Sequence, residues 1–242
     1  MAHTLPDYAT KYKLATVFAN IDNSELAARL GSVVTFDRRG NVIFIDDFEA
    51  GTLKWKTGGA GAGNAVALDT TWAKTGSKSC KLTAGAGVGG QAYIYRYFGV
   101  PITGKIGLEH SFTLNASTSR VLTELRHFTG TKYYTGYIRY TLPDGTLEVY
   151  DGAGRFITIE DDYYLESAKD TFHTLKLVVD TDTKKYIRLL INNTTWLLSD
   201  YSLKQENDAT KTSMYAAIVH TQDTAAAKSI WVDDVILTQN EP

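Results

Sequence analysis

The sequence predicts an all-β fold, built as an antiparallel sandwich or barrel. Short β-rich runs return about every ten residues, a spacing typical of such folds. The connectors between them, among them Pro143-Asp144-Gly145 and Asn192-Asn193-Thr194, are polar turn sequences. A composition of 15 Tyr and 20 Gly in 242 residues favours strands and tight turns. A chain of this length suffices for one large sandwich, so a second domain is not required.

Charge and composition exclude several classes of partner. The 25 basic and 27 acidic side chains leave a net charge of −2, so we expect neither nucleic acid nor a membrane as a partner. No run approaches the ~18 apolar residues of a membrane span, and the N-terminus lacks the apolar core of a usual secretion signal. Cys80 is the single cysteine. We expect it to be a buried thiol, and no intramolecular disulfide can form.

The N-terminal region differs from the rest of the chain. Residues 1–20 mix apolar, aromatic and lysine side chains without a period of 2 or 3.6, which predicts an extended arm that packs on another surface. That surface is either a neighbouring subunit or an edge strand of the chain's own sandwich. Ile21 to Gly31 reads IDNSELAARLG. Polar N-cap candidates, good helix formers and a terminal glycine predict one short helix there. Residues 1–40 are therefore predicted to hold the arm, the helix and the start of a hairpin, and residues 41–242 the sandwich domain.

The first core strand is predicted to follow a hairpin turn and to pair with the last strand. Ser32 to Phe36 and Asn41 to Ile45 flank the turn Asp37-Arg38-Arg39-Gly40, which predicts a hairpin. Acidic residues follow its second strand in the sequence FIDDFEAG. Near the end of the chain, Trp231 to Leu237 repeats an apolar strand interrupted by two aspartates. We expect these first and last strands to lie side by side.

The middle of the chain reads as strand after strand. The glycine-rich sequence from Thr57 to Ala65 is predicted to be a loop, because glycine lacks side chains that hold a strand. Asp200 to Thr212 is predicted to be a polar loop. The predicted strands are Trp72–Thr83, Gln91–Val100, Ile106–Leu114, Val121–Phe128, Tyr133–Leu142, Thr146–Tyr150, Phe156–Ile159, His173–Asp180, Tyr186–Ile191, Thr195–Leu198, Met214–His220 and Ile230–Thr238.

Three passages together resemble the jelly-roll carbohydrate-binding modules and their concanavalin-like lectin relatives. They are the DDFE–G–W opening from Asp46 to Trp55, the strand from Gly76 to Leu82, and the closing sequence from Trp231 to Val235. The run from Phe172 to Asn193 is similar to a strand pair of the same folds. The resemblance covers roughly residues 42–238 and implies a jelly-roll sandwich, and a likeness at the level of the fold does not determine function.

The resemblance also implies a structural Ca²⁺ site. In such modules the opening acidic residues, a carbonyl of the second passage and an aspartate of the closing strand commonly hold calcium. The matching positions here are Asp47, Glu49, the backbone at Lys78, and Asp233 or Asp234. Calcium takes six to eight hard oxygen ligands, which suits this set. The alternative is that these acids are solvated strand ends that cap turns.

A glycan-binding sheet needs exposed aromatic rings and polar side chains together. One face of the strand from Val121 to Phe128 carries Glu124 and Arg126, and one face of the next strand carries Tyr137 and Arg139. If these faces adjoin, the four residues form a polar and aromatic patch, which Tyr95 or Tyr97 of an earlier strand would join. The alternative is that they are ordinary cross-strand pairs on a solvated face.

No catalytic pattern stands out. The E-x-D-x-x-E arrangement of concanavalin-like hydrolases is absent. The nearest acidic cluster, Glu160-Asp161-Asp162 with Glu166, reads as a solvated turn. The five histidines lack zinc-binding spacing, and no serine lies in a GxSxG motif. We therefore expect a protein that is not an enzyme.

These features together predict a structural or binding protein. A lectin-like sandwich with an arm, without a secretion signal or a disulfide, suits a subunit of a virus particle, such as a phage capsid decoration or tail protein. It would be made in the cytoplasm, would act in the virion or outside the cell after lysis, and would contact other subunits, its own copies included, through residues 1–20. The alternative is a free-standing carbohydrate-binding module, and a glycoside hydrolase ranks third.

Overall fold

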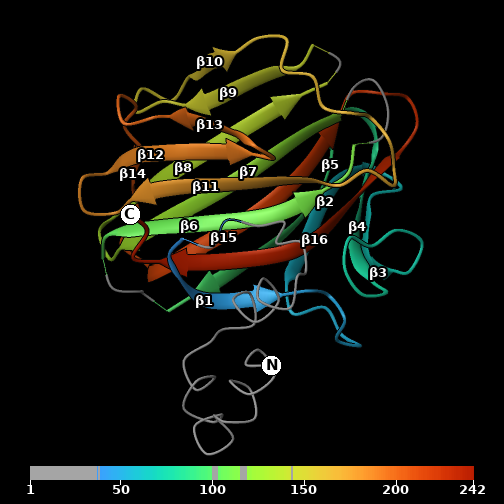
Figure 1. Ribbon diagram of the computed structural model, residues 1–242, viewed down its shortest axis with the longest axis horizontal. Coiled ribbons are helices and arrows are strands. Elements are labelled where there is room, and N and C mark those ends of the chain that lie inside the picture. Colours follow the sequence, from blue (N-terminus) through green and yellow to red (C-terminus); the bar gives the residue numbers. More distant parts are fainter. Residues whose placement is uncertain (1–36, 38, 100–102, 115–118, 143) are drawn as a thin grey trace, which may run out of the picture. The chain divides into compact units, whose positions relative to one another are not determined.

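The computed structural model describes residues 37, 39–99, 103–114, 119–142 and 144–242. In this part of the chain, 16 strands form two eight-stranded antiparallel sheets packed as a sandwich (Figure 1). The predicted fold class is thereby confirmed. Arg39–Pro242 forms one compact unit. The predicted arm, helix and first hairpin strand lie within residues 1–36, outside the described residues.

Sheet A lies towards the viewer in Figure 1. The strand β1 pairs with β16 beside the main path of the sheet. In spatial order the other strands are β13 (Thr194–Leu197), β12 (Lys185–Ile191), β11 (His173–Asp180), β6 (Lys105–Phe112), β16 (Lys228–Gln239), β4 (Ser79–Ala84) and β3 (Ala65–Asp69), and β1 spans Asn41–Asp46.

Sheet B lies behind sheet A in this view. The short strand β14 pairs with one end of β8, beside β9. In spatial order the other strands are β10 (Phe156–Glu160), β9 (Thr146–Tyr150), β8 (Lys132–Thr141), β7 (Ser119–Thr129), β15 (Thr212–Gln222), β5 (Ala86–Phe98) and β2 (Lys56–Ala62), and β14 spans Lys204–Asn207.

The first and last strands lie side by side, as predicted. β1 and β16 are antiparallel partners, with Asp46 opposite Val235. Asp46 is 2% exposed and its carboxylate accepts the indole N–H of Trp55 at 2.9 Å. A buried carboxylate without a hydrogen-bond donor would cost free energy. The bond to Trp55 therefore holds the end of β1 in place.

The glycine-rich segment is a strand, so the prediction of a loop over Thr57–Ala65 was wrong. β2 pairs with β5, and Gly58 lies opposite Tyr93. A Cβ atom at Gly58 would lie 2.3 Å from the ring of Tyr93. The glycines are therefore used for close approach to the neighbouring strand, a role that strand glycines can have.

Three other boundaries differ from the prediction. The strand predicted from Trp72 begins only at Ser79, and the segment before it is a loop tied to acidic side chains, described below. β5 begins at Ala86, within the glycines predicted to separate two strands. The predicted polar loop over Asp200–Thr212 contains β14, which is too short and polar to stand out from its neighbours.

The core lies between the sheets and is apolar. Leu108, Leu177 and Leu237 of sheet A and Ile138 and Ile218 of sheet B are all fully buried. Cys80 is buried there as a free thiol, as predicted. Among the described residues no helix has the length and hydropathy of a membrane span.

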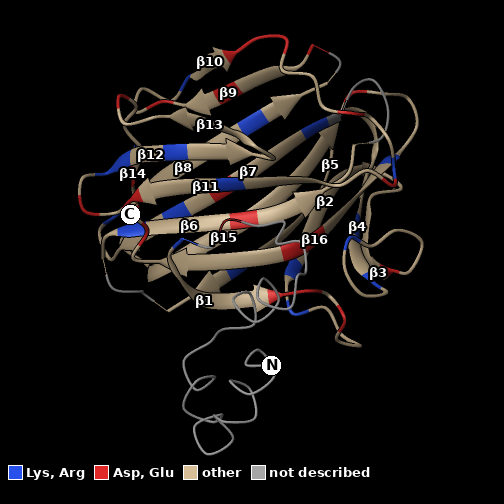
Figure 2. Cartoon of the chain, viewed as in Figure 1, with Lys and Arg blue, Asp and Glu red and all other residues tan. Residues whose placement is uncertain are grey.

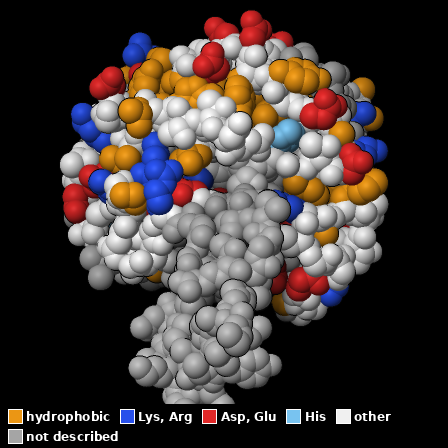
Figure 3. Space-filling view, in the orientation of Figure 1, with side chains coloured by type: hydrophobic (Ala, Val, Ile, Leu, Met, Phe, Trp, Pro, Cys, Tyr) orange, Lys and Arg blue, Asp and Glu red, His pale blue; other side chains and the backbone are white. Residues whose placement is uncertain are grey.

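In the described part of the chain, charge is spread without a dominant sign. Acidic and basic residues are interspersed along the strands and loops of both sheets (Figure 2). The face on the side of sheet A shows the same mixture of basic, acidic and apolar side chains (Figure 3). This mixture over the described residues agrees with the net charge of −2 of the whole chain.

Candidate functional site

The register of sheet B brings a set of polar and aromatic side chains together on its outer face. In the pair β7–β8, Glu124 lies opposite Tyr137 and Arg126 lies opposite Thr135. On the other side of β7, Tyr215 of β15 lies opposite Arg126. Residues that lie opposite each other point to the same face. The outward faces of the two predicted strands therefore adjoin, as expected.

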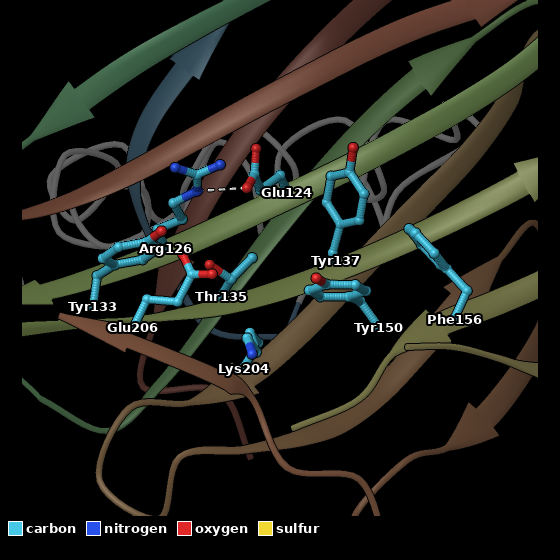
Figure 4. A pocket seen from close by; sticks show the side chains of 9 residues that line it. All are labelled: Glu124, Arg126, Tyr133, Thr135, Tyr137, Tyr150, Phe156, Lys204 and Glu206. Carbon is cyan, nitrogen blue, oxygen red and sulfur yellow. Dashed lines mark hydrogen bonds and ion pairs between the residues drawn. The ribbon is translucent and has the colours of Figure 1, made fainter. Parts of the chain in front are cut away.

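Of these side chains, Glu124, Arg126, Thr135 and Tyr137 line a groove with a cavity volume of about 290 Å³, and Tyr215 lies beside it (Figure 4). Figure 4 shows Arg126, Tyr133 and Glu206 on one side, Tyr137, Tyr150 and Phe156 on the other, and Thr135 and Lys204 between them. Among the described residues, neither Lys204 nor Glu206 has an ion-pair partner. The groove thus offers free charged groups as well as ring faces.

Arg126 is held rigidly at the centre of this face. Its Nε donates to Glu124 Oε1 at 2.5 Å, and its guanidinium lies 5.4 Å from the ring centre of Tyr133 and 5.1 Å from that of Tyr215. The anchored Nε leaves the two Nη groups as further donors at the edge of the groove. Glu124 is 5% exposed, and burial raises its pKa although Arg126 opposes the rise. Glu124 therefore acts first as the support of Arg126.

The opposite wall is aromatic. The ring centres of Tyr137 and Tyr150 lie 6.0 Å apart, and those of Tyr150 and Phe156 lie 5.0 Å apart. Arg139 stacks on Phe156 at 3.6 Å and pairs with both oxygens of Glu148, at 2.5 and 2.9 Å. Arg139, predicted as a glycan ligand, therefore lies behind this wall, on the same face but not in the lining of the groove.

A buried tyrosine of sheet A supports the groove from below. The hydroxyl of Tyr186 donates to the carbonyl of Tyr150 at 2.6 Å and accepts the backbone N–H of Tyr137 at 2.8 Å. Gly136 makes room for this contact, because a Cβ there would lie 2.8 Å from Val179 and 3.5 Å from the ring of Tyr186. The backbone of β8 and β9 under the aromatic wall is thereby pinned across the core.

Tyr95 and Tyr97 lie on the same face, beyond β15. Tyr97 lies opposite Tyr215, with ring centres 5.1 Å apart, and Tyr95 lies opposite Ala217. Neither lines the groove. Of the six predicted glycan-binding residues, the structure places three in the groove, namely Glu124, Arg126 and Tyr137, and the other three beside it.

Sequence reasoning missed most of the lining. Tyr133 and Thr135 share the parity of Tyr137 along one strand, so alternation alone would have found them. Tyr150 and Phe156 belong to predicted strands but were not assigned to a face. Lys204 and Glu206 lie in β14, over which the sequence predicts a loop, so nothing in the sequence assigns them to a sheet face.

The acidic residues predicted to bind calcium hold one loop. Glu49 accepts the backbone N–H of Ser77 at 2.7 Å and that of Lys78 at 2.6 Å, as well as the hydroxyl of Ser77 at 2.8 Å. These bonds, first of all that from the backbone of Ser77, lower the pKa of Glu49. Asp47 accepts the N–H of Glu49 at 3.2 Å.

The closing strand holds the other end of the same loop. Asp233 accepts the backbone N–H of Lys74 at 2.8 Å and that of Thr75 at 3.2 Å. Asp234 accepts the hydroxyl of Thr75 at 2.6 Å. Burial and the neighbouring carboxylate raise the pKa of Asp233 to about 6. The two acidic strand ends thus fasten residues 74–78 from both sides.

Hydrogen bonds within the chain already occupy much of the acceptor capacity of Glu49 and Asp233. The oxygens of Glu49 and Asp233 face N–H and O–H donors, which take the lone pairs that a cation needs. Among the described residues, no group of three or more His, Cys, Asp or Glu side chains is placed to hold a metal ion. Calcium binding by Asp47, Glu49, Lys78, Asp233 and Asp234 stays a prediction from the resemblance.

Chelation tests this prediction. A metal bound only by the folded chain stabilises it by about 2.7 kcal/mol at a hundredfold excess over its Kd. Calcium binding therefore predicts a lower melting temperature in chelator and no such response in an Asp47→Ala variant. A melting curve that chelator leaves unchanged means that these carboxylates act through hydrogen bonds alone.

The acidic cluster considered for catalysis lies away from the groove. Glu160 ends β10 and accepts the indole N–H of Trp196 at 3.2 Å, and neither Asp161, Asp162 nor Glu166 lines the groove.

No protein-family model and no curated protein sequence matches the chain. Solved structures do resemble it. An endo-β-1,4-glucuronan lyase from the fungus Trichoderma reesei aligns with a TM-score of 0.56 and 11% identity over 82% of this chain and 95% of that one. A carbohydrate esterase from the Shiga toxin-encoding bacteriophage phi24B aligns with a TM-score of 0.51 and 13% identity over 82% and 98%.

The carbohydrate recognition domain of Emp46p, in its potassium-bound form, aligns with a TM-score of 0.50 and 12% identity over 76% of this chain and 88% of that one. At such identities the likeness shows the fold alone. The sandwich is of the concanavalin-like type, as the resemblance in the sequence implied.

Proposed function

We propose that this protein binds a polysaccharide chain in the groove of sheet B. The observation that carries the proposal is the guanidinium of Arg126, which lies 5.4 Å from the ring centre of Tyr133 and 5.1 Å from that of Tyr215, with its Nε anchored on Glu124. A sugar ring has an apolar face that stacks on aromatic rings and hydroxyl groups that need donors and acceptors. The groove supplies both kinds of contact, and ligand sites combine them in this way.

The similar folds support the same class of ligand. Two of the three are named for carbohydrate-active enzymes and one for carbohydrate recognition. This support is at the level of the fold, and the groove residues carry the proposal. The alternative of a free-standing carbohydrate-binding module thus fits the described part of the chain better than a purely structural role.

Titration calorimetry with glucuronan and cello-oligosaccharides tests the proposal. We expect saturable binding of one series, and the two probes separate a carboxylated from a neutral ligand. Phe156→Ala removes a ring of the groove wall and should weaken binding about tenfold, the equivalent of about 1.4 kcal/mol. Tyr164→Ala is the matched control, because Tyr164 is 70% exposed and does not line the groove. Equal affinities of the two variants would contradict the assignment of the groove.

The binding is proposed to be non-catalytic. Glycosidases place two carboxylates on either side of the bond that breaks, and the groove does contain Glu124 and Glu206. However, Glu124 is 5% exposed and is held by Arg126 at 2.5 Å, which suits a supporting residue better than a proton donor.

Pure protein is therefore expected to release no reducing ends from glucuronan or cellulose and to form no product with the ultraviolet absorbance of an unsaturated sugar. Turnover that disappears in a Glu124→Gln variant would overturn this proposal and make the protein an enzyme.

The role of a phage-particle subunit is a second proposal. Its support is that a bacteriophage protein, the phi24B carbohydrate esterase, has a similar fold. The contact would run through residues 1–20, which lie outside the described residues. Deleting these residues should abolish homo-oligomers while the sandwich still folds, as measured by solution mass and circular dichroism. A full chain that is monomeric at high concentration rules out self-assembly through this segment.

A further inference from the structure

A cluster of tyrosines adjoins the groove on the side of β5. Tyr95, Tyr97 and Tyr215 are named here the tyrosine platform. The ring centres of Tyr95 and Tyr215 lie 5.7 Å apart and those of Tyr97 and Tyr215 lie 5.1 Å apart. None of the three lines the groove. The platform is therefore a separate aromatic surface of the same sheet face.

The platform rests on an apolar base but is open to solvent. Leu122, Ala217 and Val219 point to this outer face and are at most 9% exposed, because tyrosines cover them. Tyr97 remains 38% exposed. Tyr95 and Tyr215 pack on this base, and Tyr97 is held beside them by ring contacts at 6.2 Å and 5.1 Å between centres. Rings held in this way lose little freedom when a ligand stacks on them. A fixed and exposed aromatic surface is what a stacking site requires.

A basic side chain lies at the edge of the platform. The ammonium group of Lys211 lies 5.2 Å from the ring centre of Tyr97 and 5.2 Å from that of Phe128. Among the described residues it has no ion-pair partner within 4 Å. It offers three N–H donors beside the ring of Tyr97.

The platform and the groove form one continuous path across the strands. Tyr97, Tyr215, Arg126, Thr135 and Lys204 lie opposite one another in turn on β5, β15, β7, β8 and β14. Neighbouring strands lie about 4.8 Å apart, so this row of five strands spans about 19 Å. That distance exceeds the length of a single sugar ring several times.

We infer that the tyrosine platform is a second sugar-binding subsite, reached by the same polysaccharide chain that occupies the groove. The chain would cross the strands of sheet B from the aromatic wall of the groove, over Arg126, to Tyr97. The subsite would take a neutral or charged sugar by its apolar ring face, with Lys211 donating to a hydroxyl or carboxylate. This inference rests on the proposed function and adds the length and direction of the ligand.

The test is a length series of glucuronan and cello-oligosaccharides, from disaccharide to octasaccharide, titrated into the full chain. Wild-type affinity should rise with length until the ligand covers both surfaces. Tyr97→Ala should weaken binding of the octasaccharide about three- to tenfold, as expected for one aromatic contact, and leave the short members unchanged. Phe156→Ala should weaken short and long members alike, and Tyr164→Ala should change neither.

The outcomes separate the two proposals. Short and long oligosaccharides that bind wild type equally, or a Tyr97→Ala variant that keeps full affinity for the octasaccharide, overturn the second subsite while the groove stands. If Tyr97→Ala also weakens binding of the disaccharide, the platform and the groove are one site, and the proposal of a second subsite is overturned. No binding of any member overturns the proposed function and the subsite together.

Discussion

Replacing Gly90 with alanine is expected to destabilise the protein by about 3 kcal/mol. A Cβ atom at Gly90 would lie 1.8 Å from the carbonyl oxygen of Gly85 and 2.8 Å from its carbonyl carbon. Because both atoms belong to the backbone, no side-chain rotation can relieve the overlap. Gly85 cannot move away, because it lies against Gly61: a Cβ atom at Gly85 would lie 2.4 Å from the carbonyl group of Gly61. The strands at this end of sheet B would have to move apart.

Urea denaturation measures this effect. Gly51→Ala is the matched control, because a Cβ there meets nothing within 4 Å and the backbone does not need a positive φ. We expect the control to change the free energy of unfolding by less than about 0.5 kcal/mol. Equal stabilities of the two variants would mean that the strand glycines are not needed for close approach.

Replacing Arg126 with alanine should cost both stability and glycan binding. The substitution leaves Glu124, 5% exposed, without its charged partner, and a buried unpaired charge costs about 2–3 kcal/mol here, since Arg126 itself is partly exposed. It also removes the guanidinium that lies over Tyr133 and Tyr215. We expect binding of oligosaccharides to become undetectable by calorimetry.

The loss of stability should depend on pH. Burial raises the pKa of Glu124, with Glu206 adding to the rise and Arg126 opposing it, so the variant should raise this pKa further. When folding raises the pKa of a carboxyl group, the folded state favours the protonated form. The group's favourable contribution to stability is therefore complete below its unfolded pKa of about 4.3, and it is lost as the pH rises through the pKa of the folded state. The deficit of Arg126→Ala should therefore be full at neutral pH and shrink as the pH falls towards about 4.3.

A double variant separates the two effects. In Glu124→Leu/Arg126→Leu no charge is left unpaired, so stability should largely return while binding stays lost. Thermal melts over a range of pH, together with titrations at neutral pH, provide the measurements. If the double variant is as unstable as Arg126→Ala, or if the deficit of the single variant is independent of pH, the unpaired carboxylate is not the cause.

The sequence alone determined the fold class and part of the site. Alternation along Tyr93–Tyr97, Val121–Phe128 and Tyr133–Leu142 predicted strands with one polar and aromatic face, because successive side chains of a strand point to opposite sides. The pairing of the first and last strands was also predicted, from two similar acidic strand ends, and the structure confirms it. The alternation is a local pattern that each strand carries by itself, and the pairing was predictable because two distant segments carry the same acidic pattern.

Only the tertiary structure decided which of these faces meet and what completes the groove. Lys204 and Glu206 become groove residues because β14 pairs with β8, and nothing in four polar residues indicates a partner about 70 positions away. β2 is a strand because it pairs with β5. It contains glycines because the ring of Tyr93 and the neighbouring backbone lie too close for a side chain. Close approach, and the pairing of segments that share no sequence pattern, are properties of two segments together, so the sequence of either one cannot contain them.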